Sequence, residues 1–290
     1  MQRIFLTADP RLYQIAVLGV LVAYGVIVLD FGIHWYNALA IAASAMLVQL
    51  LGTTLTGSAR FDARSPLITA LSLTMLLRTD DILLAAAAAA IAIGSKFAVR
   101  IRGKHVFNPA NVAIVSLMFV SDSVWISTGQ WGNAAIGALA LACLGFIVLT
   151  RARRAETTFS FLIAYAVLLV SRALWLGDPL AIPLHHLQNG ALLIFAFFMI
   201  SDPKTTPNTP AGRISYGAVV AAIAFLIQFT LYQPNGPVIA LILAAPLVPV
   251  IDFFRRGSSY QWHAPRASDS EASRMHHETI QGDLRCEHSS

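Results

Sequence analysis

Apolar residues occupy long, nearly unbroken runs along this chain, and short polar stretches separate them. A bilayer core of about 30 Å requires roughly 20 apolar residues in a helix. The pattern predicts an all-α polytopic membrane protein. We expect ten membrane-embedded segments: Leu12–Leu29, Tyr36–Thr54, Pro66–Leu77, Ile82–Val99, Asn111–Val120, Ala134–Thr150, Phe159–Trp175, Gln188–Ile200, Ile214–Leu231 and Gly236–Phe254.

Three of these segments are too short to cross a bilayer unaided: Pro66–Leu77, Asn111–Val120 and Gln188–Ile200. They either draw flanking polar residues into the membrane or are broken helices. Irregular backbone survives at that depth only where protein or a cavity shields it from lipid. Asparagine and proline also open two of the apolar runs, in FNPAN (Phe107–Asn111) and QPNGP (Gln233–Pro237). These residues either mark functional breaks or cap helices at the interface.

The two halves of the chain show the same order of features. SPLITALSLTMLLRTDD in the first half and QNGALLIFAFFMISDPKTTP in the second are apolar runs that end in acidic residues. One long apolar run and then a broken helix start follow each of them. Since five segments is an odd number, the second copy must be inverted, an arrangement that places a site near the membrane midplane. We therefore expect two inverted five-helix repeats with broken or re-entrant helices, residues 1–132 and 133–256, and a disordered polar cytoplasmic tail, residues 257–290.

Composition and charge agree with a membrane protein. The chain is 57% hydrophobic and only 12% charged, with a mean hydropathy of +0.66. With the N-terminus placed in the cytoplasm, all of the 20 lysines and arginines except Arg78 and Arg172 fall on the cytoplasmic side. This asymmetry predicts cytoplasmic N- and C-termini, and it explains the pI near 9.5 without a nucleic-acid partner. The first apolar run is expected to be a retained anchor and not a signal peptide.

Four stretches of the sequence resemble one known family. They are SPLITALSLTMLL, GKHVFNPANVAIVSLMF, FFMISDPKTTPNTPAGRISYG and YQPNGPVIALILAAPLVPVIDFF. Between Pro66 and Phe254 the chain resembles the NqrB/RnfD family, the membrane subunits of the sodium-pumping NADH:quinone reductase and of the Rnf ferredoxin:NAD complex. The resemblance implies a ten-helix inverted-repeat fold in a bacterial inner membrane. It also implies flavin binding, electron transfer coupled to ion movement, and other Rnf- or Nqr-like subunits as partners.

The chain departs from the family at the flavin attachment motif. The family links FMN to the threonine of an S-G-A-T motif, and the corresponding region here reads SDSVWISTGQWGNAAIG, with Thr128 as its only threonine. We therefore do not expect covalent FMN. Either a flavin (FMN or riboflavin) binds without that bond, or the chain has lost the flavin and kept the scaffold. In the second case it is a non-redox channel or carrier for a small solute or ion.

The two helix breaks, FNPAN and QPNGP, occupy corresponding places in the two halves and supply three candidate site residues. The side chains of Asn108 and Asn235 each carry a donor and an acceptor that can bind the edge of a flavin ring or replace water around an ion. Lys104, which precedes the first break, presents a compact positive charge suited to a phosphate. The alternative role of Lys104 is to anchor the chain at the cytoplasmic interface.

The string SDPKTTP supplies two further candidates, Asp202 and Thr206. A carboxylate at the end of a membrane helix is costly unless it is paired or solvated. Asp202 therefore either orders this loop and meets a cation or polar flavin groups, or it caps a turn formed with Thr205, Thr206 and Pro207.

The other polar residues support no catalytic or metal site. Asp80 and Asp81 are expected to form a solvated helix end that pairs with Arg78, and His185 and His186 to lie at the aqueous interface. Cys143 and Cys286 have no plausible disulfide or zinc partner. At most, the chain is one subunit of an ion-translocating oxidoreductase, since none of its motifs does redox chemistry by itself.

Overall fold

The helix boundaries follow the predicted apolar runs closely. A computed structural model describes residues 9–57, 61–101, 103–126, 144–145, 155–255, 257 and 260. All elements below belong to the unit Met1–Ser259, and of the second unit, Tyr260–Ser290, only Tyr260 is described. The expected runs match α2 (Pro10–Ile27), α3 (Trp35–Leu55), α4 (Arg64–Leu76), α5 (Ile82–Ala98), α6 (Pro109–Val120), α8 (Ala155–Leu176), α10 (Gly190–Ile194) with the π-helix η1 (Phe195–Met199), α11 (Pro210–Thr230), and α12 (Gly236–Ala244) with α13 (Leu247–Phe254).

Two predictions fall on residues outside that set. Apart from residues 144–145, the expected run Ala134–Thr150 is not described, and neither are Thr128, Cys143 and Cys286. The predicted tail, residues 257–290, is described only at 257 and 260.

Polar caps explain where three of the helices begin. Asp9 accepts a hydrogen bond from the backbone N–H of Arg11 before α2, Asn108 accepts one from Asn111 before α6, and Thr209 accepts one from Gly212 before α11. In each case a proline follows at the first helical position, where its missing N–H costs nothing. The Asn-Pro pair in FNPAN is therefore a helix cap at a buried position, since Asn108 is only 8% exposed.

Several elements were not predicted. Strand β1 (Leu77–Arg78) pairs antiparallel with β4 (Trp125–Ile126), and β2 (Arg100–Ile101) pairs with β3 (Lys104–His105). A short helix, α9 (Ala181–Leu187), precedes α10, and a bend of 47° separates α12 from α13. The last apolar run is thus bent at Ala245–Pro246, because proline cannot continue the hydrogen-bond ladder. The only break that we predicted for it was at its start.

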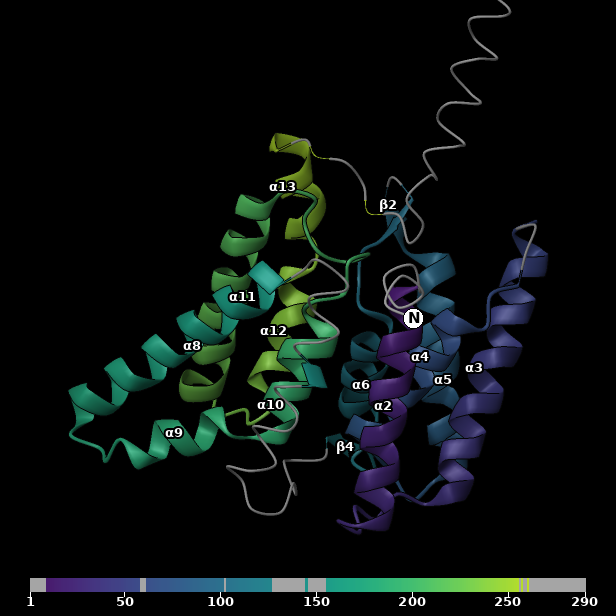
Figure 1. The fold of residues 1–290 in the computed structure, drawn as a ribbon, viewed down its shortest axis with the longest axis horizontal. Coiled ribbons are helices and arrows are strands. Elements are labelled where there is room, and N and C mark those ends of the chain that lie inside the picture. The colour runs from purple at the N-terminus through teal and green to yellow at the C-terminus, as the bar shows by residue number, and fades with distance from the viewer. Residues whose placement is uncertain are drawn as a thin grey trace, which may run out of the picture. The chain divides into compact units, whose positions relative to one another are not determined.

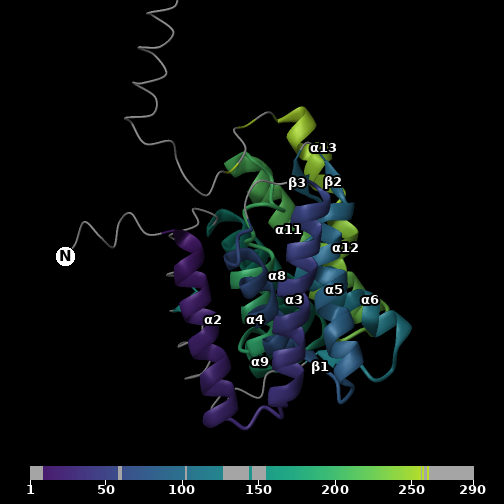
Figure 2. The ribbon, with the colours of Figure 1, turned by 90° about the vertical axis from the view of Figure 1, so that its right-hand side faces the viewer.

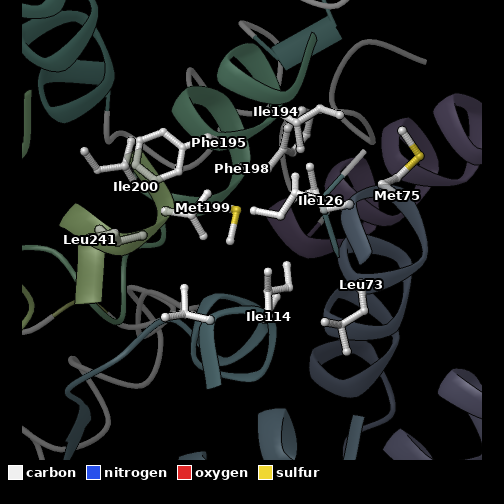
Figure 3. Packing of buried hydrophobic residues seen from close by; sticks show 14 of the residues in the cluster. Leu73, Met75, Ile114, Ile126, Ile194, Phe195, Phe198, Met199, Ile200 and Leu241 are labelled. Atoms are coloured by element: carbon white, nitrogen blue, oxygen red, sulfur yellow. The ribbon is translucent and has the colours of Figure 1, made fainter. Parts of the chain in front are cut away.

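Helix packing repeats a pattern in the two halves. α3 packs on α5 and α5 on α6, while α8 packs on α11 and α11 on α12 (Figures 1 and 2). Alanines permit the close approach of α5, since Ala85, Ala88, Ala89 and Ala92 are fully buried. Buried apolar residues of α4, α6, η1, α12 and β4 join these helices into one core, with Met199 between Ile126 and Leu241 in Figure 3.

Helix α5 runs from one end of this unit to the other. The β1–β4 pair lies at the start of α5, at what we call the ribbon end, and the β2–β3 pair lies at its other end, the hairpin end. Helix α11 also begins at the hairpin end, because Lys104 contacts Asn208 just before it. Its 21 residues then rise by about 30 Å toward the ribbon end.

The described residues contain four helices that are long and apolar enough to cross a membrane, or up to six if each bent pair is one span. Large apolar side chains are exposed along them, including Leu55 (85%) and Ile163 (63%). A water-soluble fold would bury such side chains, whereas a lipid-facing surface tolerates them. The chain is therefore a predominantly helical, multi-pass membrane protein. α4 and α6, with 13 and 12 residues, reach only about 20 Å and do not cross a bilayer by themselves.

Candidate functional site

A pocket with about 70 Å³ of accessible space lies next to the ribbon end, where the broken segments meet. Helices α8 to α12 and strand β4 contribute to its wall. Its apolar lining comprises Leu76, Ile126, Ala191, Leu192, Phe195, Met199, Pro234, Pro237 and Val238. Five polar residues interrupt that lining: Tyr165, His186, Asn189, Gln228 and Asn235.

The polar residues of the pocket differ in whether their side chains already form hydrogen bonds within the protein. Tyr165 donates a short hydrogen bond from its hydroxyl group to Oε1 of Gln228. Asn189 caps α10 by accepting from the backbone N–H of Ala191 (2.8 Å). Asn235 precedes α12 but makes no side-chain capping bond. Its amide is therefore the group best placed to hydrogen-bond a molecule in the pocket.

Asn108 and Asn235, the two predicted breaks, enter the core from opposite ends. Asn108 follows strand β3 at the hairpin end, whereas Asn235 follows the far end of α11. From there α12 and α13 return toward the hairpin end, because Asp252 of α13 contacts Lys104 (2.9 Å). Asn108 reaches the pocket only indirectly, since its amide donates to the carbonyl oxygen of Met199 (3.3 Å), which lines the pocket.

The short helices that follow the two breaks meet inside the protein. Asn111, in the first turn of α6, is 1% exposed and donates to the carbonyl oxygen of Val238, in the first turn of α12 (3.0 Å). Each of these N-termini carries a partial positive charge from the helix dipole. The contact thus joins two positive helix ends beside the pocket.

The other three predicted residues form a separate cluster at the hairpin end. Lys104 donates to the carbonyl oxygen of Thr206 (2.7 Å), to Oδ1 of Asn208 (3.0 Å) and to Oδ2 of Asp252 (2.9 Å). These contacts use all three ammonium hydrogens. Lys104 therefore ties the β2–β3 hairpin to the 202–208 loop and to α13. Neither of its predicted roles, binding a flavin phosphate or anchoring the chain at the interface, includes these contacts.

Asp202 and Thr206 shape the loop in this cluster. Oδ1 of Asp202 accepts from the backbone N–H of Lys204 (2.9 Å), and its carbonyl oxygen accepts from that of Thr205 (3.1 Å). This geometry is the turn-capping alternative for Asp202. Thr206 is fully buried, and its hydroxyl group has no hydrogen-bond partner among the described residues.

Two further basic residues lie near this loop. Burial and the nearby positive charges of Lys96 and Arg100 lower the pKa of His105 to about 4, so its imidazole is neutral at physiological pH. Lys96, in α5, is 5% exposed and donates to the hydroxyl groups of Ser65 and Thr69, each at 3.0 Å. Asp202 is close enough to interact with its charge. A buried ammonium at such a depth is costly, which is typical of functional positions in membrane proteins.

One sequence prediction is wrong in the described residues. Arg78 does not pair with Asp80 or Asp81: it donates to the carbonyl oxygens of Thr74 and Leu77, Asp80 lies 3.6 Å from His34, and Asp81 caps α5. The Arg78 side chain turns back over its own helix end, so the acids cannot reach it. His186 was predicted to lie at the aqueous interface. The structure places it in the lining of the pocket, because α9 turns back beside α11 and brings it against Phe229 (6.2 Å between rings).

Sequence reasoning did not find Tyr165, Asn189 or Gln228. Tyr165 and Gln228 lie within expected apolar runs, where a polar side chain must face protein or a cavity and not lipid. That placement was the available signal. Within the residues that the structure describes, no group of three histidines, cysteines or acids is arranged to hold a metal ion.

Comparison with known proteins finds one family that resembles the half of the chain containing this pocket. A model of the NQR2, RnfD, RnfE family matches residues 122–261. This part of the chain is similar to that family. The match covers all but one of the residues that line the pocket, Leu76 being the exception. The resemblance seen in the sequence is therefore confirmed for the half that contains the pocket.

The similar curated proteins share one name, which describes each of them as a component of an ion-translocating oxidoreductase complex. One from Citrobacter koseri is 35% identical over 133 residues (45% of this chain and 36% of that protein). One from Cronobacter sakazakii is 35% identical over 162 residues (54% and 44%). One from Escherichia coli O7:K1 is 34% identical over 131 residues (45% and 36%). The chain thus spans less than half the length of these relatives.

Proposed function

We propose that this chain is a membrane subunit of an ion-translocating electron-transfer complex, and that its pocket holds a flavin without a covalent bond. The single observation that carries the proposal is the location of this pocket inside the part of the chain that matches the NQR2, RnfD, RnfE family. The names of the relatives favour other subunits of the same kind as partners. A bilayer is the medium that the apolar helices require.

The pocket residues fit the flat, partly polar ring system of a flavin. Leu192, Phe195 and Val238 supply apolar walls, and the amides of Asn189 and Asn235 can hydrogen-bond the polar edge of the ring. Bound flavin would supply the electron-transfer chemistry, and these residues would bind it, orient it and exclude water. The lack of an S-G-A-T motif supports binding without the phosphoester bond, as FMN or riboflavin.

The scaffold of the proposed function consists of ten segments in two inverted five-helix repeats, residues 1–132 and 133–256, with residues 257–290 as a polar tail. Two observations support this arrangement. The α3–α5–α6 packing has a counterpart in α8–α11–α12. The matched breaks at Asn108 and Asn235 come from opposite ends and meet through α6 and α12. Such an arrangement is typical of transport proteins with a central site.

The charge distribution supports an inner-membrane orientation with both termini in the cytoplasm. Arg78 and Arg172 lie toward the ribbon end, since Arg78 is in β1 and Arg172 lies over Phe229 near the end of α11. Among the described residues, the lysines and arginines of the hairpin end are Arg11, Arg64, Lys96, Arg100, Lys104, Lys204, Arg213 and Arg255. Positive residues concentrate on the cytoplasmic side of membrane proteins, so we assign the hairpin end to the cytoplasm.

A buried polar group at the cytoplasmic end supports ion coupling. Lys96, Ser65 and Thr69 form a buried polar group near Asp202 at the cytoplasmic end. A buried lysine in such a group can release a proton and take it up again. In the assembled complex, Lys96→Met should reduce ion movement more than electron transfer. An equal loss of ion movement and electron transfer would show that Lys96 takes no part in ion coupling.

The colour of the purified protein tests the flavin proposal. The chain is expressed with its complex, purified in detergent, and its visible absorbance is recorded before and after acid precipitation. The proposal predicts flavin bands that move to the supernatant. Flavin that stays in the pellet would show a covalent bond and contradict our assignment. A colourless chain that also fails to take up added FMN or riboflavin would favour the second candidate, a non-redox carrier on the same scaffold.

A further inference from the structure

A second, smaller pocket lies at the ribbon end, on the same α4–β1 segment that contributes Leu76 to the proposed flavin pocket, but with a separate set of lining residues. It has about 20 Å³ of accessible space and is walled by the loop before α3, the first turns of α3, the end of α4 and strand β1. Its polar lining residues include His34, Asn37, Arg78 and Thr79. None of these residues has a role in the electron-transfer proposal.

Arg78 is the distinctive residue of this pocket. It is only 8% exposed, and no carboxylate lies within ion-pair distance of it among the described residues. Nη1 donates to the carbonyl oxygens of Thr74 and Leu77, both at 2.9 Å, and the guanidinium lies over the Phe31 ring (5.9 Å), whereas Nη2 is buried and has no hydrogen-bond partner among the described residues. A buried guanidinium with no counter-charge is strongly unfavourable, so an anion beside Nη2 would stabilise the fold.

Two neighbours of Arg78 complete a set of polar groups. Oδ1 of Asn37 is buried and accepts no hydrogen bond, while its amide nitrogen is fixed by donation to the carbonyl oxygen of Thr79 (2.7 Å). The hydroxyl oxygen of Thr79 accepts from the backbone N–H of Asp81 (3.2 Å), which leaves its proton available for donation. The pocket thus offers two donors and one acceptor to a single guest.

The nearby carboxylates do not lie beside Nη2 of Arg78. The Asp80 side chain is 83% exposed and faces His34, and Asp81 is engaged as the cap of α5. Neither of them lines the pocket.

We propose that this pocket binds a phosphate group. Phosphate oxygens would accept hydrogen bonds from Nη2 of Arg78 and from the Thr79 hydroxyl group. A donor on the guest, either a P–OH group or the ammonium of a zwitterionic headgroup, would donate to Oδ1 of Asn37. Guanidinium groups are the preferred partners of phosphate because they combine charge with directed donors.

The surroundings of the pocket place it at the level of lipid headgroups. Trp125 pairs with Arg78 across the β1–β4 ribbon and is 47% exposed, and Trp35, next to His34, is 73% exposed. Tryptophan concentrates at the membrane–water interface. A phosphate could therefore come from a lipid headgroup or from solution, and the experiment must separate these sources.

The test uses delipidated protein in detergent with two probes. Inorganic phosphate is titrated while the melting temperature is recorded, and phosphatidylglycerol and phosphatidylethanolamine are added separately before native mass spectrometry. We expect at least one probe to bind wild type and to raise its melting temperature. Arg78→Gln should weaken that binding roughly tenfold or more, as expected for loss of a charged hydrogen bond. A response to phosphate indicates a free anion, and a response to lipid alone indicates a headgroup.

Two variants control the result. Arg172→Gln removes a partly exposed guanidinium at the same end, which is paired with Asp178, and should leave binding unchanged. Asn37→Asp places a carboxylate in the same pocket as Arg78, so it should abolish binding and leave the protein insensitive to phosphate and lipid even if Arg78→Gln fails to fold. If neither probe binds wild type, or if Asn37→Asp binds as well as wild type, the pocket holds only water and the proposal is wrong.

Discussion

The side-chain amide of Asn111, in the first turn of α6, donates a hydrogen bond to the carbonyl oxygen of Val238, in the first turn of α12. The two residues are 127 positions apart in the chain. Each belongs to a helix that begins next to a break, and the two helices come from opposite ends of the described core. This contact is therefore a direct link between the two halves at the wall of the pocket, beside the one from Asn108 to Met199.

Removing this link should destabilise the protein. Asn111→Ala leaves the buried carbonyl oxygen of Val238 without its donor, which costs about 1–3 kcal/mol. Denaturant unfolding in detergent measures the loss. Asn235→Ala is the matched control, because Asn235 makes no side-chain capping bond and should change stability by less than about 0.5 kcal/mol. Equal losses for the two variants would contradict the structural role given to Asn111.

The Lys104–Asp252 pair should matter for stability far more than a surface pair. Its side chains are only 16% and 11% exposed, so Lys104→Met leaves a nearly buried carboxylate unpaired, at a cost of about 3 kcal/mol or more. Arg172→Gln breaks a more exposed pair, 37% and 35%, worth about 0–1 kcal/mol. Unfolding free energies of the two variants test this ranking. A double variant of Lys104 and Asp252 to methionine and leucine should recover part of the loss, and the absence of recovery would show that the hydrogen bonds to the 202–208 loop dominate.

Acid should weaken the start of α2 in a defined pH range. Burial raises the pKa of Asp9, but the hydrogen bonds from Arg11 and Arg64 outweigh that effect and lower its pKa from 3.8 to about 2. Since the folded-state pKa is below the unfolded value, this stabilisation is complete above pH about 4 and is lost as the pH falls toward 2. Asp9 should contribute about 1–2 kcal/mol at pH 5.

The comparison of wild type with Asp9→Asn isolates that contribution. The difference in unfolding free energy between the two proteins should shrink as the pH is lowered from 5 to 2.5. A difference that stays constant over this range would show that the Asp9 carboxylate is not held by Arg11 and Arg64 in the folded protein.

The sequence predicted the helices better than the site. Apolar runs of about 20 residues have few alternatives in a membrane, so the bounds of α3 and α8 could be read within a few positions. The Lys104–Asp252 pair joins residues 148 positions apart, and no local pattern marks it. Tyr165 and Gln228 were missed for a similar reason, because a single polar residue in an apolar run does not show which helix it faces. Asn235 was found because Pro-Asn-Gly-Pro is a break that the local sequence makes visible.

The most direct measurement of the central claim is the flavin content of a purified variant in which a larger side chain occupies the pocket. Leu192 is 7% exposed and lines the pocket, so Leu192→Trp should occupy the space of the flavin ring. Leu243→Trp, on the exposed face of α12, is the control. Our account predicts one acid-extractable flavin per chain in wild type and in Leu243→Trp, and a loss of at least tenfold in folded Leu192→Trp. Equal flavin content in all three proteins would contradict the placement of the flavin, and its absence from wild type would contradict the proposed function.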